Sequence, residues 1–128
     1  NFVRKGITDT LNVVDKSKVI NGIPFYSRVW CTTPDGTVSA FACGMSEALG
    51  YLTDHGVTPQ FLEDIGLNYG SYTSDKDGNF YEVWLQDATA VEEEMKLIKE
   101  FDLAGVAEWK IGFESGTDIW NTISSYLQ

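Results

Sequence analysis

The sequence predicts an α/β protein in which a frame of strands and helices is interrupted by a smaller α+β insert. Three observations support this fold class. Residues 19–30 form an apolar run that suits a strand buried on both faces, as in a parallel sheet. Residues 59–87 hold three strand-like runs rich in Tyr and Phe. Residues 89–127 then alternate helix, strand and helix, which is typical of a parallel α/β unit.

The first part of the chain predicts a helix followed by a strand. Residues 2–12 place four apolar side chains at helical spacing, namely Phe2, Val3, Ile7 and Leu11. The run "VINGIPFYSRVW" (19–30) predicts one strand, apolar on both faces in its first half. Pro24 removes one donor from the strand ladder, so we expect the strand to be irregular there or near a sheet edge.

The middle of the chain predicts a small antiparallel sheet with one helix. "GMSEALGYLTDHG" (44–56) predicts the helix, with Ser46 as its N-cap and Gly56 as its C-terminal stop. His55 is expected to cap the same helix end. "PQFLED", "NYGSYTS" and "NFYEVWLQD" predict the strands, and "SDKDGN" predicts a hairpin turn between the last two.

The last third returns to the frame. "TAVEEEMKLIKEF" has an apolar helical stripe, and Thr89 and Glu92 fit a capping box at its start. We expect the acidic residues 92–94 on a solvated helix face near the helix N-terminus. "LAGVAEW" predicts a buried strand, and "GTDIWNTISSYL" predicts a second helix, with Ser115 and Asp118 in another capping-box pattern.

The charge balance limits the class of partner. Nineteen acidic residues against nine basic ones give a formal net charge of -10. Phosphate backbones and anionic membranes would be repelled, so we expect neither nucleic-acid binding nor membrane insertion. The sequence has no apolar run long enough to span a bilayer. A neutral ligand such as a sugar is compatible with this charge, as is a simple role of the acidic surface in solubility.

Cys31 and Cys43 are the two cysteines of the chain. Their positions around a short loop-rich stretch leave two alternatives open, a disulfide or two free thiols. Their spacing matches no zinc pattern. With His55 as the lone histidine, a zinc site or a histidine-based triad has no support, and we expect no metal or other cofactor.

The predicted carboxyl ends of the two frame strands carry aromatic and charged residues. These residues are Tyr26, Arg28 and Trp30 on the first strand, and Glu108, Trp109 and Lys110 on the second. Ligands bind at this edge in parallel α/β folds. An aromatic ring can stack on a pyranose while nearby donors bind its hydroxyls. The alternative is that these aromatics are ordinary core residues. Asp87, after "VWLQ", is expected to cap the next helix or line a cleft.

Three stretches taken together resemble the C-terminal third of the family 18 glycoside hydrolases. They are "VINGIPFYSRVW", "YEVWLQDATAVEEEMKLIKEFDLAGVAEWKIGFE" and "DIWNTISSYL", and the resemblance is closest to the bacterial branch of spore-cortex-lytic and chitinase-like enzymes. It implies the last two strands of a TIM (β/α)8 barrel and their helices, with an inserted α+β subdomain. Residues 1–30 would hold a barrel helix and the seventh strand, 31–80 the insert, and 81–128 the helix, eighth strand and final helix.

The same resemblance implies an N-acetylglucosamine-containing glycan as substrate, such as peptidoglycan or chitin. The position of Trp109 forms the floor of the sugar subsite at the cleavage point in this family. Tyr26 and Arg28 would reach the substrate from the seventh strand, with Trp30 and Asp87 as further candidates. Gln86 stands where an acidic residue is commoner in the family, which weakens any role for a carboxylate there.

The family hydrolyses by a retaining, substrate-assisted route, with a Glu as general acid. That Glu closes a D-x-x-D-x-D-x-E motif, which this sequence lacks. We therefore expect an enzymatic parent protein whose acid lies outside the chain, and an inactive chain in isolation. The alternatives are a non-catalytic carbohydrate-binding or interaction module, and a structural fragment. The expected location is extracellular, at the cell envelope or on the spore. Unpaired frame strands predict a homodimer or strand-swapped assembly.

Overall fold

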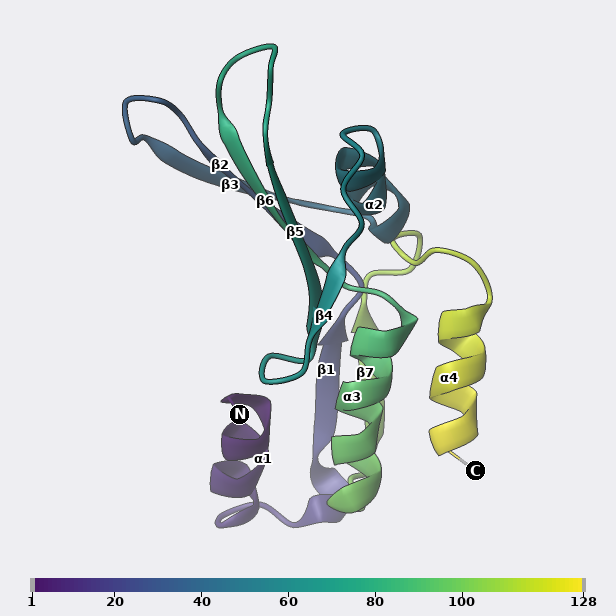
Figure 1. Cartoon of the computed structure of the whole chain (residues 1–128). Helices are drawn as coiled ribbons and strands as arrows, with labels where there is room; N and C mark the ends of the chain where they lie inside the picture. The colour runs from purple at the N-terminus through teal and green to yellow at the C-terminus, as the bar shows by residue number, and fades with distance from the viewer. Residues whose placement is uncertain (1, 128) are drawn as a thin grey trace.

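The computed structural model describes residues 2–127, which fold into two sheets and flanking helices (Figure 1). One sheet is a parallel pair of β1 (Ile20–Pro24) and β7 (Gly105–Trp109). The other is antiparallel with strand order β3-β2-β6-β5-β4, formed by β2 (Ser27–Thr32), β3 (Val38–Cys43), β4 (Gln60–Leu62), β5 (Leu67–Thr73) and β6 (Phe80–Leu85). The helices are α1 (Phe2–Leu11), the 3₁₀ turn η1 (Lys16–Lys18), α2 (Met45–Thr53), α3 (Ala88–Glu100) and α4 (Asp118–Tyr126). The predicted mixed α/β class with an antiparallel insert is confirmed.

The parallel pair joins two segments that lie 85 positions apart, since Ile20 is in register with Gly105 and Pro24 with Trp109. Helices α3 and α4 cover one face of this pair. The apolar stripe of α3 supplies most of the contacts, as its 3.6-residue period predicts. The core between them consists of Ile23, Phe25, Met45, Val91, Met95, Ile98, Ile119 and Ile123. Within residues 2–127, no further strand pairs with either outer edge.

The predicted single strand over residues 19–30 is wrong, because the chain breaks after Pro24 and passes from one sheet to the other. Phe25 is fully buried at this junction, and its amide donates to the Trp109 carbonyl over 2.7 Å. Pro24 has no amide hydrogen to continue a ladder, which favours the break there. Arg28 and Trp30 therefore lie on β2 of the antiparallel sheet and not at the carboxyl end of β1.

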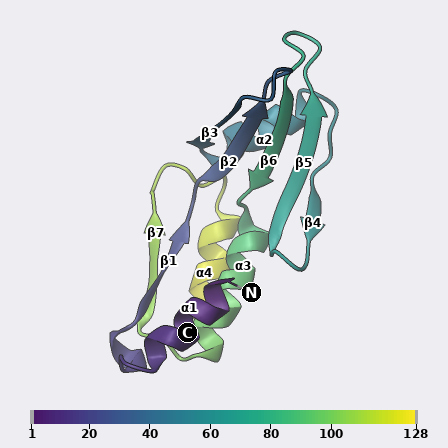
Figure 2. The ribbon, with the colours of Figure 1, turned by 90° about the vertical axis from the view of Figure 1, so that its left-hand side faces the viewer.

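Helix α2 covers one face of the antiparallel sheet. The core between them consists of Val29, Cys43, Ala48, Leu52, Val83 and Leu85. Gly70 of β5 lies directly beneath Leu52, where a Cβ atom would come within 2.7 Å of a Leu52 methyl carbon. Figure 2 shows the strands in front of α2, so that the opposite face of the sheet carries no helix. The antiparallel strands run from residue 27 to residue 85. The predicted boundaries of the inserted subdomain, at 30/31 and 80/81, stay a prediction.

The helix caps differ from the capping-box patterns. Asp87 is the N-cap of α3, and its carboxylate accepts from the Ala90 amide over 3.0 Å, so Thr89 is not the cap. Helices α2 and α4 begin after Gly44 and Thr117, and neither has a side-chain cap. The predicted caps Ser46 and Ser115 instead hydrogen-bond each other through their hydroxyls over 2.9 Å.

The C-terminal end of α2 follows the prediction. His55 Nδ1 lies 2.8 Å from the Tyr51 carbonyl oxygen, and Gly56 has a φ of 69°, the left-handed geometry that ends many helices. The imidazole of His55 also stacks on Tyr72 of β5, with ring centroids 3.8 Å apart. The lone histidine is thus used to attach the end of α2 to the sheet.

Cys31 and Cys43 do not form a disulfide. Cys31 is in register with Ser39 and Cys43 with Ser27, so they are four positions apart along this strand pair. Four strand residues span about 13 Å, whereas a disulfide requires Cα atoms within about 7 Å of each other. The alternative of two free thiols is therefore the one that the structure supports, and both side chains are buried.

Candidate functional site

A surface hollow of about 490 Å³ lies at the carboxyl end of the parallel pair. Its lining comes from both strands and from the junction after β1, and consists of Gly22, Ile23, Pro24, Tyr26, Ala107, Glu108 and Trp109. The carboxyl edge is the position at which parallel α/β folds bind ligands. The hollow therefore coincides with the edge that the sequence predicts as the site.

Trp109 is the most prominent side chain of this hollow, since 69 % of its surface is exposed. It is in register with Pro24, and Ala107 with Gly22. Alternation along a strand places these four residues on the face that α3 and α4 do not cover. Because Gly22, Pro24 and Ala107 have small side chains, the indole ring of Trp109 stays open to solvent. The peptide bond between Trp109 and Lys110 is cis.

Tyr26 and Arg28 lie together at the rim of the hollow. The guanidinium carbon of Arg28 is 5.5 Å from the centre of the Tyr26 ring, within the range of a cation–π contact. Tyr26 belongs to the lining itself, and Arg28 is the first exposed residue of β2. The structure thus brings Tyr26, Arg28 and Trp109 into one region, with hydrogen-bond donors beside an exposed aromatic ring.

Trp30 lies outside the hollow. It is on β2, opposite Ala40 on one side and Glu82 on the other, and 41 % of its surface is exposed. The sequence places it near Arg28, but the break after Pro24 moves β2 into the other sheet. Its position two residues beyond Arg28 puts both side chains on the same face of that sheet.

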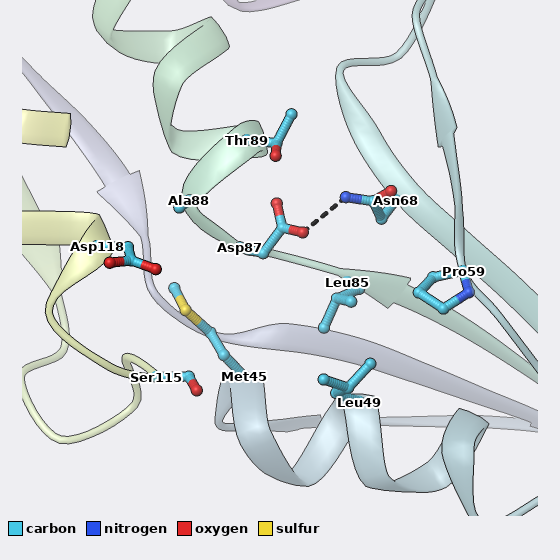
Figure 3. Close-up of a pocket in the computed structure, with 10 residues that line it drawn as sticks. All are labelled: Met45, Leu49, Pro59, Asn68, Leu85, Asp87, Ala88, Thr89, Ser115 and Asp118. Atoms are coloured by element: carbon cyan, nitrogen blue, oxygen red, sulfur yellow. Dashed lines mark hydrogen bonds between the residues drawn. The ribbon is translucent and has the colours of Figure 1, made fainter.

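Asp87 also lies outside the hollow and lines a different cavity of about 290 Å³ (Figure 3). One carboxylate oxygen caps α3, and the other accepts from Asn68 Nδ2 over 2.7 Å. Asp118, from the first turn of α4, lines the same cavity. Because both oxygens of Asp87 are engaged within the protein, its visible role is to join α3 to β5.

A contact next to Asp87, between buried Gln86 and partly buried Glu94, was not predicted from the sequence. Gln86 is almost fully buried. Its backbone N–H donates to the Ser27 hydroxyl over 2.9 Å, and its side-chain Nε2 lies 3.5 Å from a Glu94 carboxylate oxygen. Burial raises the pKa of Glu94 to about 7, and the contact with Gln86 offsets this only in part. Residues 92–94 are partly exposed. The predicted solvated position fits Glu93, whose side chain is 42 % exposed and pairs with Lys96, but not Glu94.

Glu108, next to Trp109 at the predicted strand end, also belongs to the site. It lines the hollow and is half-buried, and its register partner is Ile23. Gly22 and Ala107 were overlooked entirely, although period-two alternation along "LAGVAEW" places Ala107 on the face of Trp109. In the part of the chain from residue 2 to 127, no cluster of three His, Cys, Asp or Glu side chains could hold a metal ion.

The arrangement is suited to binding a neutral, hydroxyl-rich ligand. It offers an exposed indole, a phenol, a guanidinium and one carboxylate around a shallow hollow. An indole face stacks on the C–H face of a pyranose, and the polar groups can pair with hydroxyl or amide groups. Of the helices described in the structure, none is both long and apolar enough to cross a membrane.

No family model matches the chain, but it is similar to proteins described as glycosylases, cortex-lytic enzymes and chitinases. It is 29% identical over 112 residues to the cortical fragment-lytic enzyme of Bacillus subtilis, covering 86% of this chain and 26% of that protein. The crystal structure of the spore cortex-lytic enzyme SleL of Bacillus megaterium matches 97% of this chain and 29% of its own, with a TM-score of 0.84 and 26% identity. A family GH18 chitinase from Cycas revoluta shares the fold over 96% of this chain and 37% of its own, with a TM-score of 0.74 at 20% identity.

The chain spans about a quarter to a third of the length of the curated relatives it matches. The match covers almost all of this chain, including both sheets and the helices that flank them. The resemblance seen in the sequence is therefore confirmed: the chain is a distant relative of the family 18 glycoside hydrolases.

Proposed function

We propose that the chain is the C-terminal part of a glycoside hydrolase that acts on N-acetylglucosamine-containing glycans, such as peptidoglycan or chitin-like polymers. The observation that carries this proposal is the exposed indole of Trp109 at the carboxyl edge of the parallel pair, beside Tyr26 and Arg28. The reaction of the parent protein would be retaining, substrate-assisted hydrolysis. This chain contributes the sugar platform and the rim donors.

The proposed fold of the parent protein is a (β/α)8 barrel. In it, β1 and β7 are the seventh and eighth strands, and α3 and α4 are the helices that follow them. Support comes from the parallel register, from helices on one face of the pair only, and from two outer edges that no strand of residues 2–127 occupies. The antiparallel sheet and α2 are then the inserted subdomain.

The general acid is proposed to lie outside these 128 residues, because they lack the D-x-x-D-x-D-x-E motif. The chain alone is expected to bind glycans without cleaving them. Release of reducing ends from chitooligosaccharides, or of a chromophore from an aryl chitobioside, measures this directly. Cleavage by the purified wild-type chain that is lost on Glu108→Gln or Asp87→Asn would place the acid within the chain and contradict its proposed location.

The binding test is calorimetric titration of the chain with N,N′-diacetylchitobiose. Trp109→Ala is expected to weaken binding by about tenfold or more, equivalent to about 1.4 kcal/mol. Trp120→Phe is the matched control, because Trp120 lies on α4 and contacts Phe25 edge-on, away from the hollow. Equal affinity of the wild-type chain and Trp109→Ala would remove the sugar platform from the proposal.

A non-catalytic carbohydrate-binding module is the second candidate function. It is favoured by the same hollow combined with the absence of the acid motif in the sequence. The discriminating measurement is hydrolysis by the longest natural polypeptide that contains these residues. Glycan binding without hydrolysis by that polypeptide favours the module, and hydrolysis favours the enzyme.

Association with bacterial spores or the cell envelope is proposed from the relatives, which include a cortical fragment-lytic enzyme and a spore cortex-lytic enzyme. A homodimer or strand-swapped assembly is proposed from the open edges of β1 and β7. Sedimentation over a hundredfold concentration range tests the assembly. A single monomeric species throughout that range argues against it.

A further inference from the structure

The two edge strands of the antiparallel sheet are protected against pairing to different degrees. At one edge, β4 has three residues, and the exposed acidic residues Glu63 and Asp64 follow it directly. At the other edge, β3 has six residues, none of which is charged or a proline. Shortness, charges and prolines are features by which edge strands avoid pairing with other chains. By these criteria β4 is protected and β3 is not.

The outer edge of β3 is also accessible. Residues 38–42 are exposed, and no strand of residues 2–127 pairs with that edge. Helix α2 packs mainly on β2, β5 and β6, so its axis is set back from the edge. Figure 2 shows β3 at one side of the sheet and β4 at the other. A further extended strand can therefore approach β3 in the plane of the sheet.

The hairpin between β2 and β3 determines which backbone groups of β3 point outward. The Thr33 amide donates to the Thr37 carbonyl over 2.9 Å, so these two residues form a hydrogen-bonded pair at the end of the β2–β3 ladder. Hydrogen-bonded and non-hydrogen-bonded pairs alternate in an antiparallel ladder. The N–H and C=O groups of Val38, Ala40 and Ala42 therefore point away from β2, and they are spaced symmetrically about Ala40.

We propose that β3 pairs in antiparallel orientation with β3 of a second copy of this chain, about a two-fold axis at Ala40, so that the two antiparallel sheets join into one. Ala40 then faces Ala40 of the second copy, and Val38 of each copy faces Ala42 of the other. Each of these pairs exchanges two hydrogen bonds. The interface is independent of glycan binding, and it uses a different edge from those of β1 and β7.

The side chains of β3 favour a second copy as the partner. The chain has a formal net charge of -10, so two copies repel each other wherever acidic surfaces meet, but no charged side chain of β3 would face another. In the proposed register, Phe41 lies opposite Ser39 of the second copy, and the two Phe41 residues are diagonal neighbours about 7–8 Å apart, within reach of each other. Phe41 is 37 % exposed and already contacts Tyr51 of α2. Pairing would thus cover exposed aromatic surface and satisfy free backbone groups together.

The experiment is sedimentation of the whole chain and of variants at exposed Ala40, over a hundredfold concentration range. The wild-type chain is expected to form dimers. Ala40→Lys and Ala40→Glu each place two like charges directly opposite each other at the two-fold axis, so each is expected to weaken association by about tenfold or more. A one-to-one mixture of the two variants places opposite charges there and is expected to restore the dimer.

Two further positions provide the controls. Gln60→Lys introduces a charge on β4, at the opposite edge of the sheet, and is expected to leave the dimer intact. Ile20→Lys, at an exposed position of β1, tests the edges of the parallel pair. A wild-type chain that is monomeric at every concentration overturns the inference, as does a mixture of the two Ala40 variants that stays monomeric. Dimers that persist in both Ala40 variants and are lost in Ile20→Lys place the contact at the parallel pair and also overturn it.

Discussion

The parallel pair and the antiparallel sheet differ in how each is completed. The antiparallel sheet is built from strands between residues 27 and 85, and helix α2, which follows β3 in the chain, covers its core. The parallel pair joins residues 20–24 to 105–109, and its outer edges are unpaired in the described chain. We therefore expect the antiparallel sheet with α2 to keep its structure independently, whereas the parallel pair depends on packing against α3 and α4.

The largest effect is expected at the junction between the two regions. Phe25→Ala empties a fully buried position in the core of the parallel pair and is expected to lower the free energy of unfolding by about 3–5 kcal/mol. Urea denaturation measures the loss, and hydrogen exchange is expected to rise at β1 and β7 before β2 and β6. Phe2→Ala, at a Phe that is 93 % exposed, is the control and should cost less than about 0.5 kcal/mol. Equal increases in exchange in both sheets would contradict the proposed independence.

A second test compares one glycine from each region. Gly70→Ala would place a Cβ atom 2.7 Å from Leu52 and 3.1 Å from Val57, so we expect a loss of about 1–3 kcal/mol. Gly22→Ala in β1 meets no atom within 4 Å and should be neutral or slightly stabilising. Thermal unfolding of both variants provides the comparison. Similar melting temperatures for the two would show that α2 does not pack closely on β5.

A third test addresses the link between the regions. Asp87 caps α3 and accepts from Asn68 of β5, so Asp87→Ala is expected to cost about 1–2 kcal/mol. Thr89→Ala is the matched control, because Thr89 fits a capping pattern in sequence but forms no cap. Chemical denaturation distinguishes them. A larger cost for Thr89→Ala would restore the capping-box prediction.

The smallest effect is expected from Glu94, whose folded-state pKa of about 7 lies above the ordinary value of 4.5. Between pH 4.5 and 7 the folded state therefore binds more protons at Glu94 than the unfolded state does. The contribution of Glu94 protonation to the free energy of unfolding is complete below about pH 4.5 and is lost as pH rises through 7. Glu94→Gln is expected to remove this loss and raise stability at pH 8 by roughly 1 kcal/mol, less than the full pKa shift implies because Glu94 is partly exposed. Urea titrations at pH 5 and pH 8 measure it; an unchanged pH dependence would mean that Glu94 is solvated.

The helices and most strands were predictable from periodicity and turn residues. The α3 stripe, the "SDKDGN" hairpin and the Gly56 stop were all found where their local chemistry indicated. The capping boxes failed, because Asp87 stands in extended geometry two residues before Thr89 and competes for the same amides. A pattern of residue types does not show which of two neighbouring side-chain acceptors will bind the free N–H groups of the first helical turn.

The candidate site was predictable only where it depends on the ends of paired strands. Trp109 ends β7 and Tyr26 follows β1, and these strands pair in parallel, so their meeting at one edge follows from topology. Trp30 belongs to a different surface, because the chain changes sheets after Pro24 and β2 pairs with β6. That change depends on which strands pair, and pairing involves partners far away in the sequence.

The α/β character, the aromatic residues at the strand ends and the resemblance to family 18 glycoside hydrolases follow from the sequence, since they depend on local periodicity and on the order of motifs. Three features become visible in the folded chain alone: the strand over residues 19–30 divides between two sheets, the cysteines stand four positions apart, and Asp87 joins α3 to β5. These features depend on strand register and helix packing, and both are set by contacts between residues distant in the chain.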